Sequence, residues 1–172
     1  MKETNEIRIS FNRVIVFLLF LGSSFFVYIG YGMILEDILF YNFIGTVSII
    51  FFGYGMIMTG IMLFDFSPGL IINSEGIFDN SSGIKAGMIL WNEITDITLA
   101  GTTRQKFITI HVVNPDKYFN SSNIIKNIAT RISNIIYGSP IHINSIALDI
   151  NFDELHMMID EKFKLYRKLN KT

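Results

Sequence analysis

The sequence predicts an α+β membrane protein: an N-terminal transmembrane helical hairpin, then a meander of short antiparallel strands followed by amphipathic helices. Three observations support this prediction. Half of the 172 residues are hydrophobic and only 17% are charged, against roughly 25% in typical globular chains. Two long uncharged runs adjoin each other near the N-terminus. After them, short β-branched or aromatic runs alternate with turn residues, and the hydrophobic period then changes to that of a helix.

The two uncharged runs are Val14 to Leu35, with 22 residues, and Ile38 to Phe64, with 27. At ~1.5 Å per residue, these runs are about 33 and 40 Å long as helices, and a bilayer's hydrocarbon core is roughly 30 Å thick. Only Glu36 and Asp37 separate the runs, so the two helices must be antiparallel neighbours. The sequence therefore predicts a membrane hairpin over residues 14–64.

A cleaved signal peptide is the main alternative for the first run, because Lys2, Arg8 and Arg13 precede it. However, Glu3 and Glu6 lie among these cations, and the run is longer than the roughly 7 to 15 residues of a signal-peptide core. We therefore expect the first span to be retained.

The distribution of basic residues predicts the orientation of the hairpin. Residues 1–13 contain three basic side chains, the turn at Glu36 and Asp37 contains none, and the chain after Asp65 contains eleven. Because basic residues collect on the cytoplasmic side, we expect a multi-pass protein of the plasma (inner) membrane with both termini in the cytoplasm. The predicted domains are a cytoplasmic segment 1–13, the hairpin 14–64 (spans 14–35 and 38–64) and a cytoplasmic domain 65–172.

Small residues recur every seven positions in both runs: Ser23 and Gly30 in the first, and Thr46, Gly53 and Gly60 in the second. This spacing places them on one helix face, where small side chains let membrane helices approach closely. Glycine is also simply common in membrane helices, so both interpretations stay open. The first predicts helix packing, or self-association of the hairpin, through these five residues.

Residues 65–172 carry eleven basic and eleven acidic side chains, which is ordinary for one domain. Strand-like runs occupy 70–73, 76–78, 88–91, 94–99, 107–113 and 141–149. Between the last two, isoleucines at helical spacing predict an amphipathic helix: Ile124, Ile125, Ile128, Ile132 and Ile135. Asn151 and Glu154 have the spacing of a capping box, which predicts a final helix over residues 152–169.

Residues 7–11 have two interpretations. Ile7, Ile9 and Phe11 alternate with polar residues, as in a strand that could pair with the sheet after the hairpin. Alternatively, the segment is an interfacial extension that leads into the first span.

The two spans, the stretches Gly69 to Ile77 (GLIINSEGI) and Gly87 to Ile94 (GMILWNEI), and the last helix resemble bacterial membrane-anchored PH-like proteins. More closely, the chain resembles an uncharacterised bacterial family of small membrane proteins with a two-helix transmembrane hairpin followed by a PH-like domain. The resemblance implies a PH-like antiparallel β-sandwich or partly open barrel, in which two packed sheets are capped by a C-terminal helix over residues 152–169. It places Trp91 to Ile94 where one strand passes into the next, and it implies no catalytic residue.

The sequence offers no catalytic constellation. His111, His142 and His156 belong to no HExxH motif and have no acidic pair at metal-ligand spacing, and the chain has no cysteine. We therefore expect no enzyme activity, no cofactor and no metal, and the net charge of −1 argues against nucleic-acid binding. Trp91, a single large aromatic residue within an apolar run, is interpreted as a core residue.

Two functional hypotheses remain. The first is a PH-like protein-interaction module at the cytoplasmic face, anchored in the lipid bilayer, with protein partners or self-association through the hairpin. The second is a membrane-lipid-binding or envelope-stress-sensing module, in which Lys162, Lys164, Arg167 and Lys168 contact anionic lipid. The same four cations also suit the solvated C-terminal end of a helix, whose dipole they complement.

Overall fold

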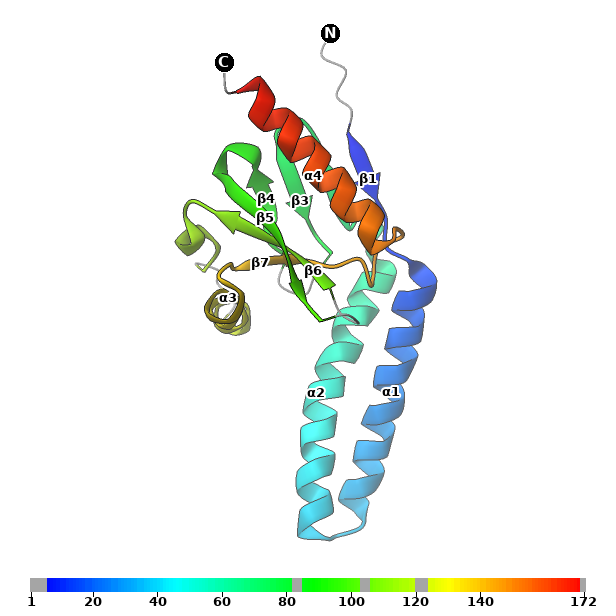
Figure 1. Ribbon diagram of the computed structural model, residues 1–172. Coiled ribbons are helices and arrows are strands. Elements are labelled where there is room, and N and C mark those ends of the chain that lie inside the picture. The colour runs from blue at the N-terminus through cyan, green and yellow to red at the C-terminus, as the bar shows by residue number, and fades with distance from the viewer. Residues whose placement is uncertain (1–5, 82–84, 103–105, 120–123, 171–172) are drawn as a thin grey trace. The chain divides into compact units, whose positions relative to one another are not determined.

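The computed structural model describes residues 6–81, 85–102, 106–119 and 124–170. The chain forms two compact units, whose elements Figure 1 labels in chain order. One unit is Phe11–Ser67, and the other joins Met1–Ser10 to Pro68–Thr172. The hairpin therefore interrupts the sequence of the second unit.

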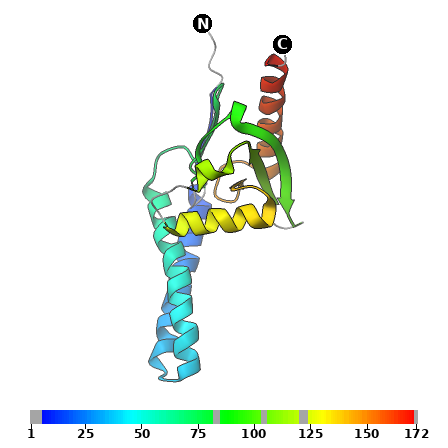
Figure 2. The same ribbon diagram turned by 90° about the vertical axis from the view of Figure 1, so that its left-hand side faces the viewer.

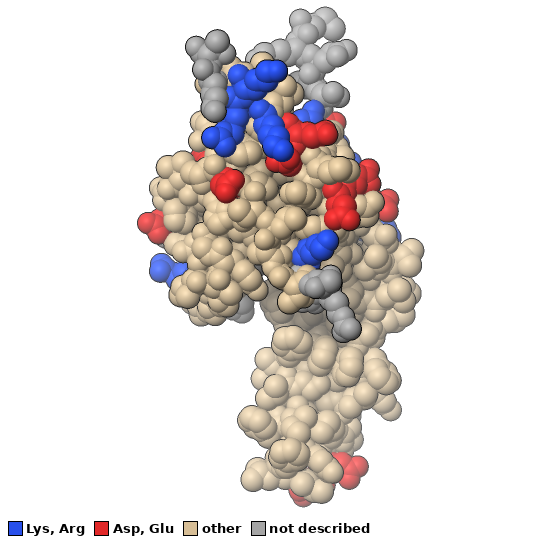
Figure 3. All heavy atoms as spheres, in the orientation of Figure 1, with Lys and Arg blue, Asp and Glu red and all other residues tan. Residues whose placement is uncertain are grey.

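The first unit consists of helices α1 (Arg13–Leu35) and α2 (Leu39–Phe64), and it confirms the two expected helices. Asn12 caps α1, since its side-chain oxygen accepts a hydrogen bond from the Ile15 N–H at 3.1 Å. Both helices are long and apolar enough to cross a membrane, and their apolar side chains are largely exposed. In Figure 3 the visible surface of the hairpin is uncharged apart from acidic atoms at its tip, where the sequence has Glu36 and Asp37.

The first sheet of the second unit has the strand order β1-β2-β3-β4, and all its pairs are antiparallel. Its strands are β1 (Ile7–Ile9), β2 (Leu70–Ile72), β3 (Gly76–Asp79) and β4 (Gly87–Leu90). Ile7 pairs with Ile72, and Ile9 pairs with Leu70. Of the two interpretations of the N-terminal segment, the strand is therefore correct.

The second sheet has the order β5-β6-β7, with β5 (Ile94–Gly101), β6 (Lys106–Val112) and β7 (Ile141–Ile143). The strand expected over residues 141–149 ends at Ile143, because Asn144 accepts from the Ile146 N–H and Leu148 donates to the Ser145 carbonyl, which turns the chain. Within the described residues the two sheets form no closed barrel.

Two helices complete the second unit, α3 (Ile124–Tyr137) and α4 (Phe152–Leu169). Asn151 begins α4 as expected: its side-chain oxygen accepts from the Glu154 N–H at 2.8 Å. α4 and both sheets contribute the fully buried core residues Leu70, Ile72, Ile77, Ile89, Ile108, Ile110, Ile143, Leu155 and Ile159. Burying each such side chain contributes about 1.5–3 kcal/mol relative to leaving it in water.

The pairing of β1 predicts how the folded domain responds to a change in the N-terminal segment. Ile9→Ala removes a buried side chain and should destabilise the domain by about 2–5 kcal/mol. Arg8→Ala, at an exposed position of the same strand, should change stability little. Thermal unfolding of the full chain in detergent measures both. If Ile9→Ala melted at the same temperature as the unchanged protein, β1 would contribute nothing measurable to the domain's stability.

Candidate functional site

The corner between the two sheets is the best-defined cluster of polar and aromatic side chains in the second unit. A 3-10 helix, η1 (Trp91–Glu93), joins β4 directly to β5. Trp91 is 2% exposed, and its indole N–H donates a hydrogen bond to the Asn73 carbonyl at 2.9 Å. Its ring stacks on Phe163 and Tyr166 of α4, at centroid distances of 6.2 and 6.4 Å. Trp91 is thus a core residue, as interpreted from the sequence, and it holds α4 against the corner.

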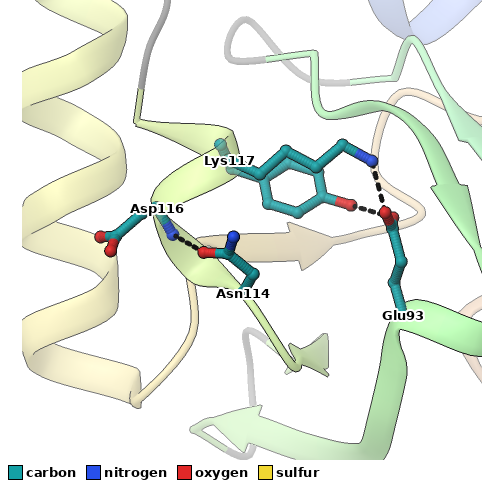
Figure 4. Close-up of polar contacts among 5 residues, drawn as sticks. Glu93, Asn114, Asp116 and Lys117 are labelled. Carbon is teal, nitrogen blue, oxygen red and sulfur yellow. Dashed lines mark hydrogen bonds and ion pairs between the residues drawn. The ribbon is translucent and has the colours of Figure 1, made fainter.

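Glu93 occupies the outer side of this corner and contacts a second 3-10 helix, η2 (Pro115–Tyr118). The Lys117 ammonium lies 2.6 Å from one carboxylate oxygen of Glu93, and the Tyr118 hydroxyl donates to the other at 3.2 Å. Figure 4 shows Lys117 pointing toward Glu93. Asn114 begins η2, because its side-chain oxygen accepts from the Asp116 N–H at 3.2 Å. The corner therefore contacts two helices: Trp91 packs against α4, and Glu93 bonds to η2.

The electrostatics of this cluster suit a structural role. The hydrogen bond from Lys117 is the largest cause that holds the pKa of Glu93 below its ordinary value of 4.5. Burial, followed by the charge and hydrogen bond of Glu93, raises the pKa of Tyr118. Near neutral pH the carboxylate stays ionised and the phenol stays protonated, so neither group is poised to exchange a proton.

The pKa of Glu93 predicts a pH-dependent stability. Because its folded-state pKa lies below 4.5, the carboxylate stabilises the fold above about pH 4.5, and this stabilisation is lost as the pH falls through the folded-state value. Glu93→Gln should therefore cost up to about 1 kcal/mol near neutral pH, since Lys117 is partly exposed, and nothing in strong acid. Thermal unfolding at both pH values measures this difference.

Asp153→Asn is the matched control, because Asp153 is 83% exposed and lies 3.8 Å from Lys106. Its effect should be small at both pH values. If the stability loss of Glu93→Gln were the same in acid as at neutral pH, the ion pair would not be its cause.

The three histidines lie apart from this corner. His111 and His142 are on β6 and β7, and His156 is on α4. The Thr98 hydroxyl and the Gly138 carbonyl contact the two ring nitrogens of His111, at 2.9 and 3.3 Å. Burial lowers the pKa of His142, whose hydrogen bonds to backbone carbonyls oppose that shift. Across the described residues, no group of three or more His, Cys, Asp or Glu side chains could hold a metal ion.

The four basic residues singled out on the last helix share its C-terminal half. Lys164 forms an ion pair with Asp160 at 2.6 Å, and the Arg167 guanidinium lies over the Phe163 ring at 5.6 Å. Lys168 is exposed, while Lys162 is half-buried. Figure 3 shows blue atoms gathered at this end of α4. Arg167 and Lys168 occupy the last turn of α4, where they complement its dipole.

In the hairpin, the backbones of the two helices meet at Gly30 and Gly45. A Cβ atom at Gly30 would lie 2.9 Å from the Gly45 carbonyl oxygen, and one at Gly45 would lie 2.5 Å from that of Gly30. Nearby, the Ser48 hydroxyl donates to the Phe26 carbonyl at 3.2 Å across the helices. Only glycine fits this contact, because the backbones themselves meet.

The other small residues of the seven-residue spacing lie as follows. Ser23 faces Gly55, whose Cβ position is 3.2 Å from the serine oxygen. Gly60 lies against Phe20 of the other helix. The Thr46 hydroxyl donates to the Asn42 carbonyl of its own helix. A Cβ atom at Gly53 would meet nothing within 4 Å.

Sequence analysis missed Gly45. The signal that could have found it is distance from the turn rather than a period: Gly30 lies five residues before the end of α1, and Gly45 lies six after the start of α2. Antiparallel helices joined by a short turn bring residues at similar distances from that turn face to face.

Arg13 was also missed as a structural residue, although its charge entered the prediction of orientation. One guanidinium nitrogen of Arg13 donates to the carbonyls of Met62 and Leu63, at 3.1 and 2.6 Å. The other donates to the Asp65 carbonyl at 2.7 Å. These carbonyls belong to the C-terminal end of α2, where no further helical turn supplies N–H partners. The first residue of α1 thus satisfies the last carbonyls of α2.

The contact between Gly30 and Gly45 predicts opposite effects for two alanine substitutions in the same helix. Gly45→Ala should destabilise the hairpin by about 1–3 kcal/mol, because the new Cβ meets backbone. Gly53→Ala, which meets nothing, should be neutral or stabilising by up to about 1 kcal/mol through its better helix propensity. Thermal unfolding in detergent, followed by helical circular dichroism, ranks the two. The same sign and size for both would contradict the contact.

Compared with known proteins, the chain matches no protein-family model, no curated protein and no solved structure. The fold itself is an α+β arrangement of two membrane-capable helices packed as a hairpin, two antiparallel sheets and a C-terminal helix. A functional proposal for this chain therefore depends on its own geometry.

Proposed function

We propose that this protein is a non-enzymatic integral membrane protein that presents a PH-like protein-interaction module at the cytoplasmic face of the plasma membrane. The pairing of β1 with β2 carries the proposal. These strands flank the hairpin in sequence, so a sheet that contains both requires the two ends of a spanning hairpin to leave the membrane on one side. The three basic residues before the first span favour the cytoplasmic side.

The layout of the second unit supports the PH-like part of the proposal. Sheets of four and three antiparallel strands, followed by a C-terminal helix, match the arrangement that the sequence resemblance implies. The corner at Trp91 to Glu93 lies where one sheet passes into the other, which is the place the resemblance assigns to this motif.

A protein-interaction role is favoured because several polar side chains bond to other residues of the fold, whereas one long strand lies at the edge of its sheet. Glu93, Lys117 and Tyr118 contact one another, and both ring nitrogens of His111 have hydrogen-bond partners, so these groups serve the fold. By contrast, β5 is the longest strand, with eight residues, and it is an edge strand that pairs with β6 alone among the described strands. Such an edge offers backbone N–H and C=O groups to an extended peptide. We propose the β5 edge as the binding site of a protein segment.

Photo-crosslinking in native membranes tests this site. A photoreactive residue replaces Thr95 or Leu99, both exposed on β5, and as a matched control it replaces Met157, which is 59% exposed on α4. We expect the same protein adduct, identified by mass spectrometry, from both β5 positions and not from position 157. Adducts with lipid only, or equal protein adducts from all three positions, would refute docking at β5.

The second hypothesis, lipid binding through the basic end of α4, has weaker support. Lys164 and Arg167 already contact Asp160 and Phe163. Arg167 and Lys168 also complement the dipole of α4 in its last turn, which accounts for their position without a lipid ligand.

A further inference from the structure

α3 is amphipathic in the opposite sense from an ordinary surface helix. Five of its isoleucines point outward: the exposed fractions are 74% for Ile124, 54% for Ile128, 50% for Ile132, 83% for Ile135 and 63% for Ile136. Thr130 of the same helix is only 1% exposed. Figure 2 shows α3 along its length, in yellow, beside the second sheet. We call the five exposed residues the isoleucine face.

The sheet beneath α3 explains why its polar side is turned inward. β6 and β7 send Ile108, Ile110, Ile141 and Ile143 into the core, so the alternate residues Thr109 and His142 lie on the other face. The Thr109 hydroxyl lies 3.1 Å from one ring nitrogen of His142, whose other nitrogen donates to the Ser139 carbonyl at 3.0 Å. The backbone of Ser133, in α3, also hydrogen-bonds His142. Turning the isoleucine face inward would take the Ser133 backbone away from His142, and it would place apolar side chains against the buried polar residue Thr109.

The charge around α3 suits an anionic surface. α3 itself contains no Asp or Glu, and its two cations are Lys126 and Arg131. Arg131 is exposed, with its guanidinium over the Phe119 ring at 5.2 Å. An apolar face combined with cations and no acids is typical of helices that lie in a membrane interface.

Short connections would keep the second unit close to a bilayer that holds the hairpin. Three residues, 10–12, separate β1 from α1, and five, 65–69, separate α2 from β2. At no more than ~3.5 Å per residue, these linkers reach about 10 and 18 Å. Tethering at such range gives a weak interfacial helix a high effective concentration at the membrane surface.

We infer that α3 is an interfacial helix whose isoleucine face inserts into the headgroup–acyl boundary of an anionic bilayer. This inference rests on the proposed membrane anchoring by the hairpin. Insertion of α3 would bind the second unit to the bilayer surface at a point other than the hairpin. It would also bury the isoleucine side chains, which water otherwise surrounds. Each isoleucine side chain removed from water adds to the binding, and Arg131 adds attraction to anionic headgroups.

Depth-dependent fluorescence quenching tests the inference on the full chain. Because the sequence has no cysteine, a fluorophore can be attached at one introduced cysteine in Ile128→Cys or Ile135→Cys. Glu161→Cys, exposed on α4, is the matched water-facing control, and Phe51→Cys, 70% exposed on α2, reports insertion of the hairpin. The labelled proteins are reconstituted in phosphatidylglycerol vesicles that contain lipids with spin labels on their acyl chains.

We expect spin-labelled lipids to quench the fluorophore at positions 51, 128 and 135 but not at 161. Quenching at 128 and 135 should weaken in phosphatidylcholine vesicles, while quenching at 51 should not. If position 51 is quenched while 128 and 135 behave like 161, the hairpin inserts and the inference about α3 is wrong. If none is quenched, membrane anchoring and the inference fail together. A blue shift at 128 and 135 without lipid quenching would mean that protein, such as a second copy, covers the face, which also overturns the inference.

The paired substitution Ile128→Ser with Ile135→Ser separates binding from folding. Both side chains are exposed, so the melting temperature in detergent should be unchanged. In the vesicles, a fluorophore at Ile132→Cys should be quenched by spin-labelled lipid in the otherwise unchanged chain. It should lose that quenching in the chain that also carries Ile128→Ser and Ile135→Ser. A large fall in the melting temperature would instead show that the isoleucine face belongs to the protein's own core.

Discussion

The pairing of β1 with β2 is the interaction on which the rest of the structure depends. One strand precedes the hairpin and the other follows it, so the first sheet forms only when the two ends of the hairpin return to one place. Inside the hairpin, Arg13 closes the same loop independently by donating to the carbonyls of Leu63 and Asp65. Bringing the two ends of the hairpin together costs conformational entropy once. Two sets of hydrogen bonds, one in each unit, together offset that cost.

The corner of residues 91–93 organises the second unit in a similar way. A three-residue connection gives its two large side chains different surroundings: Trp91 faces the core and stacks on α4, while Glu93 faces η2. Trp91 suits this position because its ring packs against aromatic residues and its single N–H finds the Asn73 carbonyl. Elements that are distant in the sequence therefore meet at one turn between the sheets.

The apolar excess of the chain divides into a part that the protein buries and a part that it leaves exposed. Both sheets and α4 contribute the fully buried isoleucines and leucines, although Leu99, Leu165 and Leu169 are exposed, whereas α1, α2 and α3 expose most of theirs. For α1 and α2 the exposure extends around the helix, as a lipid environment requires, but for α3 it is confined to one face. The periodicity that predicted α3 states which residues share a face; it contains no information about whether that face meets protein, lipid or water.

By itself, the sequence determined the two apolar helices, the short strands, the Asn151 cap and the core position of Trp91, because each depends on local periodicity, turn chemistry or one side chain's size. Tertiary structure alone decided that residues 7–9 pair with β2, that Gly45 rather than Gly53 meets Gly30, and that Arg13 completes the end of α2. It also ended β7 at Ile143 and turned the isoleucine face of α3 outward. These outcomes depend on which surfaces far apart in the chain come together, and the local pattern of residues does not specify those contacts.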